Sequence, residues 1–279
     1  MFDLYLGIAL MLCLCVAVGI ASGKLYQRIP KAGKHTLLAL ILLGIPGIWF
    51  FNSDNTLLMT IVPLSGIITF SNASPILAAA LSGIIWTGVP GGPIRKGFSS
   101  GLLLITGFGA AYVPILTPAP PTRDWWQGTL CRQTTDSTCS AASAATLLKH
   151  YGIDTTEKEM ANLCRTTTRG TVPAGVFRGL KLQTADTDLR VRVEKLTLDE
   201  LRNTTFPALI SVGLPRVHDL DPRYESKWGW TPGVLHSVVL FGFPDETSVD
   251  IGDPSVGRER WDVTGIQDLW TGQVIRLER

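Results

Sequence analysis

The chain has 279 residues and a formal net charge of +2, so its charge gives no electrostatic basis for a nucleic-acid partner. Hydrophobic residues make up 46% of the sequence and charged residues only 17%, which is high in apolar content for a soluble enzyme of this size. No G-x-x-x-x-G-K-S/T segment is present, which excludes a phosphate-binding loop and an ATPase of that type.

Four apolar stretches occupy most of residues 1–117 and predict an all-α transmembrane domain. They cover residues 4–21, 36–51, 57–89 and 101–116. Asp3 precedes the first stretch in place of a basic region, so we expect a retained membrane helix rather than a cleaved signal peptide. The third stretch is interrupted at residues 71–75, so the sequence allows four or five spans in a multi-pass integral membrane protein.

Basic residues in short loops are retained on the cytoplasmic side of a membrane, so their positions predict the topology. Two loops carry six of them: Lys24, Arg28, Lys31, Lys34, Arg95 and Lys96. If residues 57–89 cross once, both loops are inside, the chain has four spans, and the C-terminal part is extracytoplasmic. If residues 71–75 turn a hairpin, there are five spans and the C-terminal part is cytoplasmic. The sequence leaves both open, and the basic loops favour the extracytoplasmic arrangement.

Residues 118–129 are rich in proline and tryptophan and predict a short, stiff linker beside the membrane. Residues 130–279 have the composition of an α+β domain that is large enough to bury its own core. Thr–x–x–Glu/Gln patterns predict helix starts at Thr156, Thr197 and Thr264. Apolar, β-branched runs predict strands at residues 189–193, 208–212, 235–241, 249–251 and 274–277.

Cys139 lies where a polar turn meets an alanine-rich segment. Asp136, Ser137 and Thr138 are good N-cap types, and the Ala and Leu residues that follow favour a helix, so Cys139 is predicted in the first helical turn. Unpaired backbone N–H groups and the helix dipole stabilise a thiolate there, and the thiolate is the nucleophilic form of cysteine. Cysteine is also a common buried residue, so the position alone does not identify a nucleophile.

Three further residues strengthen the case for a reactive Cys139. Gln133 lies six residues upstream, on the turn that enters the helix, where its amide can donate to an oxyanion. His236 lies in a β-branched run that predicts a strand, and Asp253 ends the next predicted strand just before a proline. A thiol, an imidazole and a carboxylate in these contexts are candidates for a nucleophile, a base and a group that orients the base.

The remaining histidines are weaker candidates for the base. His150 lies 11 residues after Cys139 on the same predicted helix, about 16 Å along its axis, and cannot reach the thiol. His218 lies in a charged loop and is the fallback base. The histidines occur singly, and residues 130–279 contain no His or Cys pair at ligand spacing, so we expect no metal site and no cofactor.

The order of the four site residues resembles that of the papain-like cysteine peptidases, most closely the bacteriocin-processing, double-glycine-leader peptidase family. The resemblance covers most of residues 130–277, including the helix stop at residues 151–153 and the turn at residues 253–257. The chain departs from the family at Ser140, where many members have glycine. It also departs in domain order, since exporter-linked members place the peptidase before a membrane domain and an ATPase.

The resemblance implies an α+β papain-like cysteine peptidase domain whose nucleophile helix packs against an antiparallel sheet. It implies that a peptide or protein substrate acylates Cys139, that His236 moves the proton, and that Asp253 orients the imidazole. Gln133 and the Cys139 backbone N–H would bind the oxyanion. Expected partners are a leader peptide or small secreted precursor, the lipid bilayer and a separate transporter chain. The alternative is a catalytically silent, membrane-anchored module that binds a peptide or leader.

Cys131 begins the site loop, and Cys164 ends the next predicted helix, so a disulfide between them would tie the loop to that helix. Two free, buried thiols are the alternative. A bridge persists only in an oxidising compartment, so the extracytoplasmic topology favours it slightly.

Overall fold

The computed structural model describes residues 1–53, 55–217 and 219–279. The chain divides into two compact units. The first consists of Met1–Asn55 and Ser65–Thr117, and the second of Thr56–Leu64 and Pro118–Arg279. The second unit therefore includes a short segment from the middle of the apolar region.

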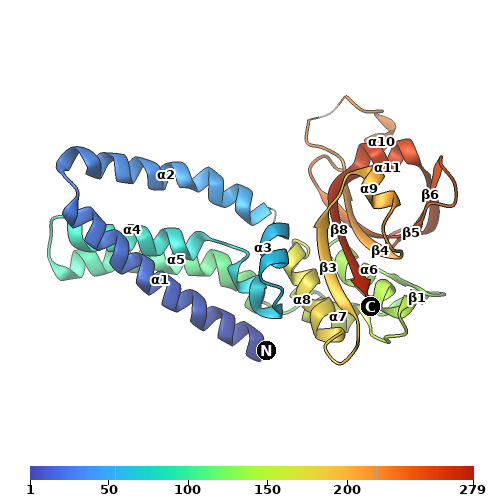
Figure 1. The fold of residues 1–279 in the computed structure, drawn as a ribbon, viewed down its shortest axis with the longest axis horizontal. Coiled ribbons are helices and arrows are strands. Elements are labelled where there is room, and N and C mark those ends of the chain that lie inside the picture. Colours follow the sequence, from blue (N-terminus) through green and yellow to red (C-terminus); the bar gives the residue numbers. More distant parts are fainter. Residues whose placement is uncertain (54, 218) are drawn as a thin grey trace. The chain divides into compact units, whose positions relative to one another are not determined.

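The first unit is helical (Figure 1). Of the described residues, two helices are long and apolar enough to cross a membrane by length and composition, and a third, α4, is apolar but shorter. The two long ones are α1 and α5. The elements of this unit are α1 (Phe2–Arg28), α2 (Lys31–Ser53), the 3-10 helix η1 (Ser65–Phe70), α4 (Ser74–Gly88) and α5 (Pro93–Leu116).

Glycines let α1 and α4 pack closely against each other. A Cβ atom at Gly83 would collide with the carbonyl oxygen of Gly19, and one at Gly23 would lie 2.9 Å from the Gly83 carbonyl oxygen. The Ser22 hydroxyl donates to the carbonyl oxygen of Ala80 across the same contact, at 2.9 Å. Small residues and serine hydroxyls are the usual means of joining helices in a membrane, where apolar side chains gain little by leaving lipid.

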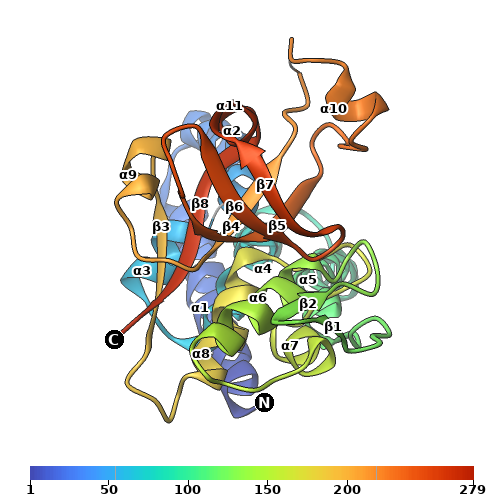
Figure 2. The ribbon, with the colours of Figure 1, turned by 90° about the vertical axis from the view of Figure 1, so that its right-hand side faces the viewer.

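The second unit contains a six-stranded antiparallel sheet with the strand order β3-β8-β4-β5-β6-β7 (Figure 2). A separate hairpin of β1 and β2 lies before the first helix of this part of the chain. The strands are β1 (Trp125–Gln127), β2 (Leu130–Arg132), β3 (Arg190–Lys195), β4 (Ala208–Gly213), β5 (Leu235–Gly242), β6 (Ser248–Asp253), β7 (Gly257–Asp262) and β8 (Trp270–Glu278).

Different helices cover the two faces of this sheet. On one face, alternate residues of β4 and β5, such as Ile210 and Val238, join a buried cluster with side chains of α9, α10 and α11. On the other face, α6 packs against β5, and α7 and α8 pack against α6 (Figure 2). These helices are α6 (Cys139–His150), α7 (Glu157–Leu163), α8 (Pro173–Gln183), α9 (Leu198–Arg202), α10 (Arg223–Ser226) and α11 (Val263–Leu269).

The apolar stretch predicted at residues 57–89 to form one or two spans is divided into three pieces. Its first piece, α3 (Thr56–Ile61), belongs to the second unit and packs against β3. The Gln273 side-chain amide donates to the Thr56 hydroxyl at 2.9 Å, so a polar group of this segment is paired within the second unit. The other two pieces are η1 and α4, and α4 begins at Ser74, within the polar interruption at residues 71–75.

The five predicted strands are confirmed as β3, β4, β5, β6 and β8. Sequence reasoning missed β1, β2 and β7. The edge strand β7 carries three consecutive charged residues, Arg258 to Arg260. Such charges hide an apolar period of two in the sequence, and on an edge strand they discourage pairing with other chains. In the folded domain these charges find local partners, since Arg260 forms an ion pair with Asp250 at 2.9 Å.

Two of the three predicted helix starts are confirmed. The Thr156 hydroxyl accepts the backbone N–H of Glu159 at 3.1 Å, and Thr197 forms a complete capping box with Glu200. The start predicted at Thr264 is wrong, because the N-cap of α11 is Asp262, two residues earlier, and it makes no side-chain capping bond. A backbone that continues directly from β7 sets this boundary instead of a cap.

Replacing Leu147 with alanine tests the packing of α6. The Leu147 side chain is fully buried in this helix, so Leu147→Ala should lower the free energy of unfolding by about 2–5 kcal/mol. Lys149→Ala on the exposed side of the same helix is the matched control and should change it by less than about 0.5 kcal/mol. Thermal unfolding followed by near-UV circular dichroism measures both, and equal effects would contradict the burial of α6.

Candidate active site

Cys139 is the first residue of α6, where the site loop enters the helix. The N-cap residue Thr138 makes no side-chain capping bond to the helix. Its hydroxyl instead accepts the backbone N–H groups of Thr134 and Thr135, at 3.2 and 3.0 Å, and so shapes the loop before the helix. The N–H groups of the first turn and the positive end of the helix dipole favour a negative charge at Cys139.

His236 and Asp253 lie on neighbouring strands, β5 and β6, and are hydrogen-bonded to each other. Nε2 of His236 lies 3.0 Å from Oδ1 of Asp253, whose residue is only 4% exposed. The same oxygen accepts the N–H and hydroxyl of Ser255 at 2.6 and 2.5 Å, and the N–H of Val256 at 3.3 Å. Burial raises the pKa of Asp253, but His236 and the Ser255 donors outweigh this effect and lower it below its ordinary value.

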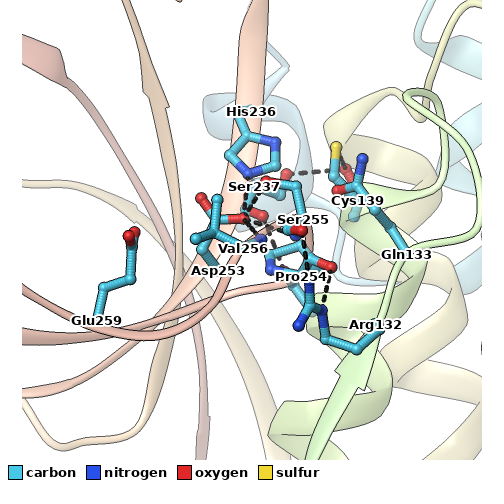
Figure 3. Close-up of polar contacts among 12 residues, drawn as sticks. Arg132, Gln133, Cys139, His236, Ser237, Asp253, Pro254, Ser255, Val256 and Glu259 are labelled. Carbon is cyan, nitrogen blue, oxygen red and sulfur yellow. Dashed lines mark hydrogen bonds and ion pairs between the residues drawn. The ribbon is translucent and has the colours of Figure 1, made fainter. Parts of the chain in front are cut away.

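The Cys139 thiol is hydrogen-bonded to the same imidazole. Because Nε2 is bonded to Asp253, Nδ1 faces the sulfur (Figure 3). Burial acts to raise the pKa of Cys139, but the hydrogen bond to His236 and its charge, together with bonds from the Ser237 backbone and the Ser140 hydroxyl, lower it. Burial acts to lower the pKa of His236, which Asp253 and Cys139 nevertheless raise to about 10. Both shifts favour the thiolate–imidazolium form of the pair over the neutral form.

Gln133 lies on the site loop, and Figure 3 shows its side chain beside the Cys139 sulfur. Its backbone N–H donates to the Pro254 carbonyl oxygen at 2.9 Å, which joins the loop to the turn that follows Asp253. Its amide nitrogen donates to the Thr135 carbonyl oxygen at 3.1 Å. A primary amide has two N–H bonds, so one remains for an oxygen atom placed next to the thiol.

Arg132 joins the turn after Asp253 to strand β2, and sequence reasoning missed it. Its Nε donates to the Pro254 carbonyl oxygen at 3.0 Å, and its Nη2 donates to the Ser255 carbonyl oxygen. The guanidinium also lies 5.0 Å from the centre of the Trp125 ring. The planar donor fork of arginine suits such paired carbonyl contacts. No local sequence pattern indicates a partner more than 120 positions away, so only the fold reveals this contact.

Residues 128–218 match the model of the Peptidase C39 family. The chain carries a Peptidase C39 domain. The matched residues include Gln133 and Cys139 and end before His236 and Asp253. The domain is an α+β, papain-like domain that follows the helical region, in agreement with the predicted fold of this part of the chain.

Two relatives of this C39 domain are uncharacterized proteins. One, from Methanothermobacter thermautotrophicus, is 28% identical over 147 residues, which are 53% of this chain and 86% of that protein. The other, from Methanothermobacter marburgensis, is 27% identical over 150 residues, which are 54% of this chain and 88% of that protein.

The solved structures similar to this chain include two from transporters. The peptidase domain of Streptococcus ComA, a bi-functional ABC transporter involved in a quorum-sensing pathway, has 24% sequence identity and a TM-score of 0.42, and the match covers 53% of this chain and 96% of that domain. A double glycine motif protease from an AMS/PCAT transporter, in complex with the leader peptide, has 19% identity and a TM-score of 0.43, and the match covers 57% and 96%.

Glu157 organises the site loop of the C39 domain from the start of α7. Its carboxylate is fully buried and accepts the Thr134 N–H at 2.7 Å and the Thr134 hydroxyl at 2.5 Å. Sequence reasoning missed it, because a glutamate in the first turn of a capped helix is usually a solvated residue that complements the helix dipole. Its burial follows from the packing of α7 against α6.

Trp230 is a second residue that the sequence did not single out. Its ring centre lies 6.1 Å from that of His236 in an edge-on arrangement, and 6.1 Å from that of Trp261. An apolar ring beside the imidazole limits the access of water to the bond between His236 and Asp253, which strengthens that bond.

Cys131 and Cys164 are free, buried thiols in the structure, so the expected disulfide is absent. The Cys131 thiol is hydrogen-bonded to the backbone of Glu157 at the start of α7, whereas Cys164 follows the end of that helix. Seven residues of helix separate the two contacts by about 10 Å, and a disulfide needs Cα atoms within about 7 Å. Burial is the main cause that raises the pKa of each thiol to about 12.

Of the two other histidine candidates, only His150 lies within the described residues. His150 is the last residue of α6, and its ring lies edge-on to Tyr151, with the ring centres 5.5 Å apart. His218, the fallback base, lies outside the described residues. Within residues 1–53, 55–217 and 219–279, no group of three or more His, Cys, Asp or Glu side chains could hold a metal ion.

Replacing His236 tests the thiolate–imidazolium pair of the C39 domain. Without the imidazolium, burial alone dominates the Cys139 thiol, so His236→Ala should raise its pKa by at least about one pH unit. Only the thiolate is alkylated, so the midpoint of the iodoacetamide rate profile should move upward and the rate at neutral pH should fall. His150→Ala is the matched histidine control, and an equal shift in both variants would contradict the pairing.

Proposed function

We propose that this chain is a membrane-anchored cysteine peptidase that cleaves peptide bonds with Cys139 as nucleophile, His236 as acid and base, and Asp253 as the group that orients the imidazole. The coupled contact of these three side chains carries the proposal, since Nε2 of His236 bonds Asp253 at 3.0 Å and the same ring bonds the thiol. A nucleophile, its base and a third group that orients the base are the pattern of activated nucleophiles.

The reaction has two steps. In the first, the Cys139 thiolate attacks the substrate carbonyl carbon and a C–S bond forms, while the Gln133 amide and the Cys139 backbone N–H bind the oxyanion. The His236 imidazolium then gives its Nδ1 proton to the leaving amine as the C–N bond breaks. In the second, neutral His236 takes a proton from water, which attacks the thioester. The C–S bond breaks, the acyl product leaves as an acid, and the thiolate and imidazolium return.

The substrate we propose is a leader peptide or a small secreted precursor. This rests on the C39 domain and on the leader peptide bound by the AMS/PCAT transporter protease. That protease and ComA belong to transporters, so a separate transporter chain is the proposed partner. A silent module that only binds a leader needs no thiol of lowered pKa, so the state of Cys139 argues for the enzyme.

Membrane anchoring by the first unit is part of the proposal. Large apolar side chains along α1 and α5 are exposed, and glycines join α1 to α4 as in membrane helix pairs. The exposed residues include Leu10, Val16, Ile105 and Val113. A soluble unit would leave an apolar surface of this kind uncovered, whereas a bilayer would solvate it.

The packing of the first unit supports the extracytoplasmic side for the peptidase. A Cβ atom at Gly88, the last residue of α4, would collide with the Tyr26 ring near the end of α1, and the Lys34 ammonium lies 4.8 Å from that ring. Lys96, near the start of α5, donates to the Trp86 carbonyl oxygen at 3.0 Å. The basic residues thus gather at one end of the unit, which the positive-inside rule assigns to the cytoplasm. The chain leaves α5 at its other end.

Replacing Cys139 tests the proposed reaction. Cys139→Ala should lower cleavage of a peptide library that includes Gly-Gly sequences by at least about a thousandfold, because it removes the nucleophile. The unfolding temperature should change little, since one small buried residue replaces another. Mass spectrometry of the products measures cleavage, and Cys164→Ala is a control cysteine outside the site. Wild-type turnover in Cys139→Ala would refute the nucleophile assignment.

Protease treatment tests the proposed side of the membrane. Protease added to spheroplasts should release a fragment that begins in the linker at residues 118–123, because the peptidase domain then faces the exposed side. Sealed vesicles of the opposite orientation are the control and should protect the domain. Protection in spheroplasts with cleavage in inverted vesicles would place the domain in the cytoplasm and contradict the four-span arrangement.

A further inference from the structure

Two serines lie directly beside the proposed catalytic residues and are hydrogen-bonded to each other. Ser140 follows Cys139 in the first turn of α6, and Ser237 follows His236 in β5. Their hydroxyl oxygens are 2.8 Å apart, and Ser140 is only 5% exposed. This bond therefore joins the helix that carries the thiol to the strand that carries the imidazole, next to both groups.

The same serines contact the sulfur. The Ser140 hydroxyl oxygen lies 4.0 Å from Sγ of Cys139, and the Ser237 backbone is hydrogen-bonded to the thiol. A serine hydroxyl has one hydrogen to donate and can accept two more. When the Ser237 hydroxyl donates to Ser140, the Ser140 hydrogen is free to point at a thiolate. The sulfur then receives donors from His236, Ser140 and Ser237.

Ser143 provides a natural comparison one helical turn further on. Its hydroxyl donates to the Ser237 carbonyl oxygen at 2.9 Å, so it also joins α6 to β5 through a buried hydrogen bond. Ser143 lies four residues beyond Cys139 and does not take part in the thiol contacts described above. A purely structural role for helix–strand bonds would make Ser140 and Ser143 equivalent.

We propose that Ser140 and Ser237 are a positioning pair that keeps Cys139 and His236 in register and turns a hydroxyl hydrogen toward the thiolate. The proposal rests on the proposed function, because it assigns the pair to a nucleophilic Cys139. It also gives a role to the position where this sequence departs from the glycine expected in the family. The Ser140 donor supplements the helix N-terminus, which on its own stabilises a thiolate by a modest amount.

The test is the pH profile of Cys139 alkylation in the full chain, with iodoacetamide as the probe and the Cys139 peptide quantified by mass spectrometry. A hydrogen bond to a charged group is worth about a factor of ten in the thiolate equilibrium. Ser140→Ala should therefore lower the rate at neutral pH about tenfold and move the midpoint up by about one pH unit. Ser237→Ala should have a similar effect, and the double variant should add little to Ser140→Ala.

Ser143→Ala is the matched control, expected to lower the unfolding temperature as much as Ser140→Ala while leaving the profile unchanged. An unchanged profile in folded Ser140→Ala, or equal shifts in all three single variants, would overturn the proposal. If the alanine variants unfold, Ser237→Thr and Ser237→Val replace them, because both side chains suit a strand and differ mainly in the hydroxyl. Ser237→Thr should then retain the wild-type profile, and Ser237→Val should shift it. Failure of the proposed function gives a different result, because the wild type and His236→Ala would then have the same pH profile of Cys139 alkylation.

Discussion

The hydrogen bond between His236 and Asp253 is the interaction on which the architecture of the C39 domain depends. A carboxylate that is 4% exposed is costly to bury unless it is paired and fully hydrogen-bonded. Here one oxygen of Asp253 accepts the imidazole and three donors from the turn that follows. Arg132 and the Gln133 backbone hold this turn through hydrogen bonds to the Pro254 carbonyl oxygen. Segments that are far apart in the sequence thus come together to stabilise the buried Asp253 carboxylate.

This arrangement links stability to reactivity. The buried residues of β5, β6 and α6 also keep water from the site, which strengthens the electrostatic coupling of Cys139, His236 and Asp253. The pKa of His236 rises to about 10 although burial acts against its charge, because two negative partners face one ring. Neither partner acts alone, so the three groups titrate as one unit. The buried Glu157 carboxylate likewise accepts a hydrogen bond from the loop that carries Gln133, so a second buried charge fixes part of the site.

The sequence predicted the parts of the site that depend on local structure. Cys139 at a helix start, His236 in a strand and Asp253 at a strand end follow from capping residues, alanine content and β-branched runs, and the fold places each of them in that element. Contacts across long sequence separations were missed, such as Arg132 on the turn at residues 254–255. The sequence also could not predict that Cys131 and Cys164 are unbridged, because this depends on the distance that α7 places between them.

The central claim is that Cys139 and His236 form a thiolate–imidazolium pair, and NMR titration of the imidazole nitrogens in the full chain tests it most directly. The account predicts that both nitrogens of His236 stay protonated through neutral pH and that the ring loses its proton only near the raised pKa of about 10. In Cys139→Ala the same ring should titrate at a lower pH, because one of its two negative partners is gone. A wild-type His236 that titrates near the ordinary value of 6.5 and is unaffected by Cys139→Ala would contradict the account.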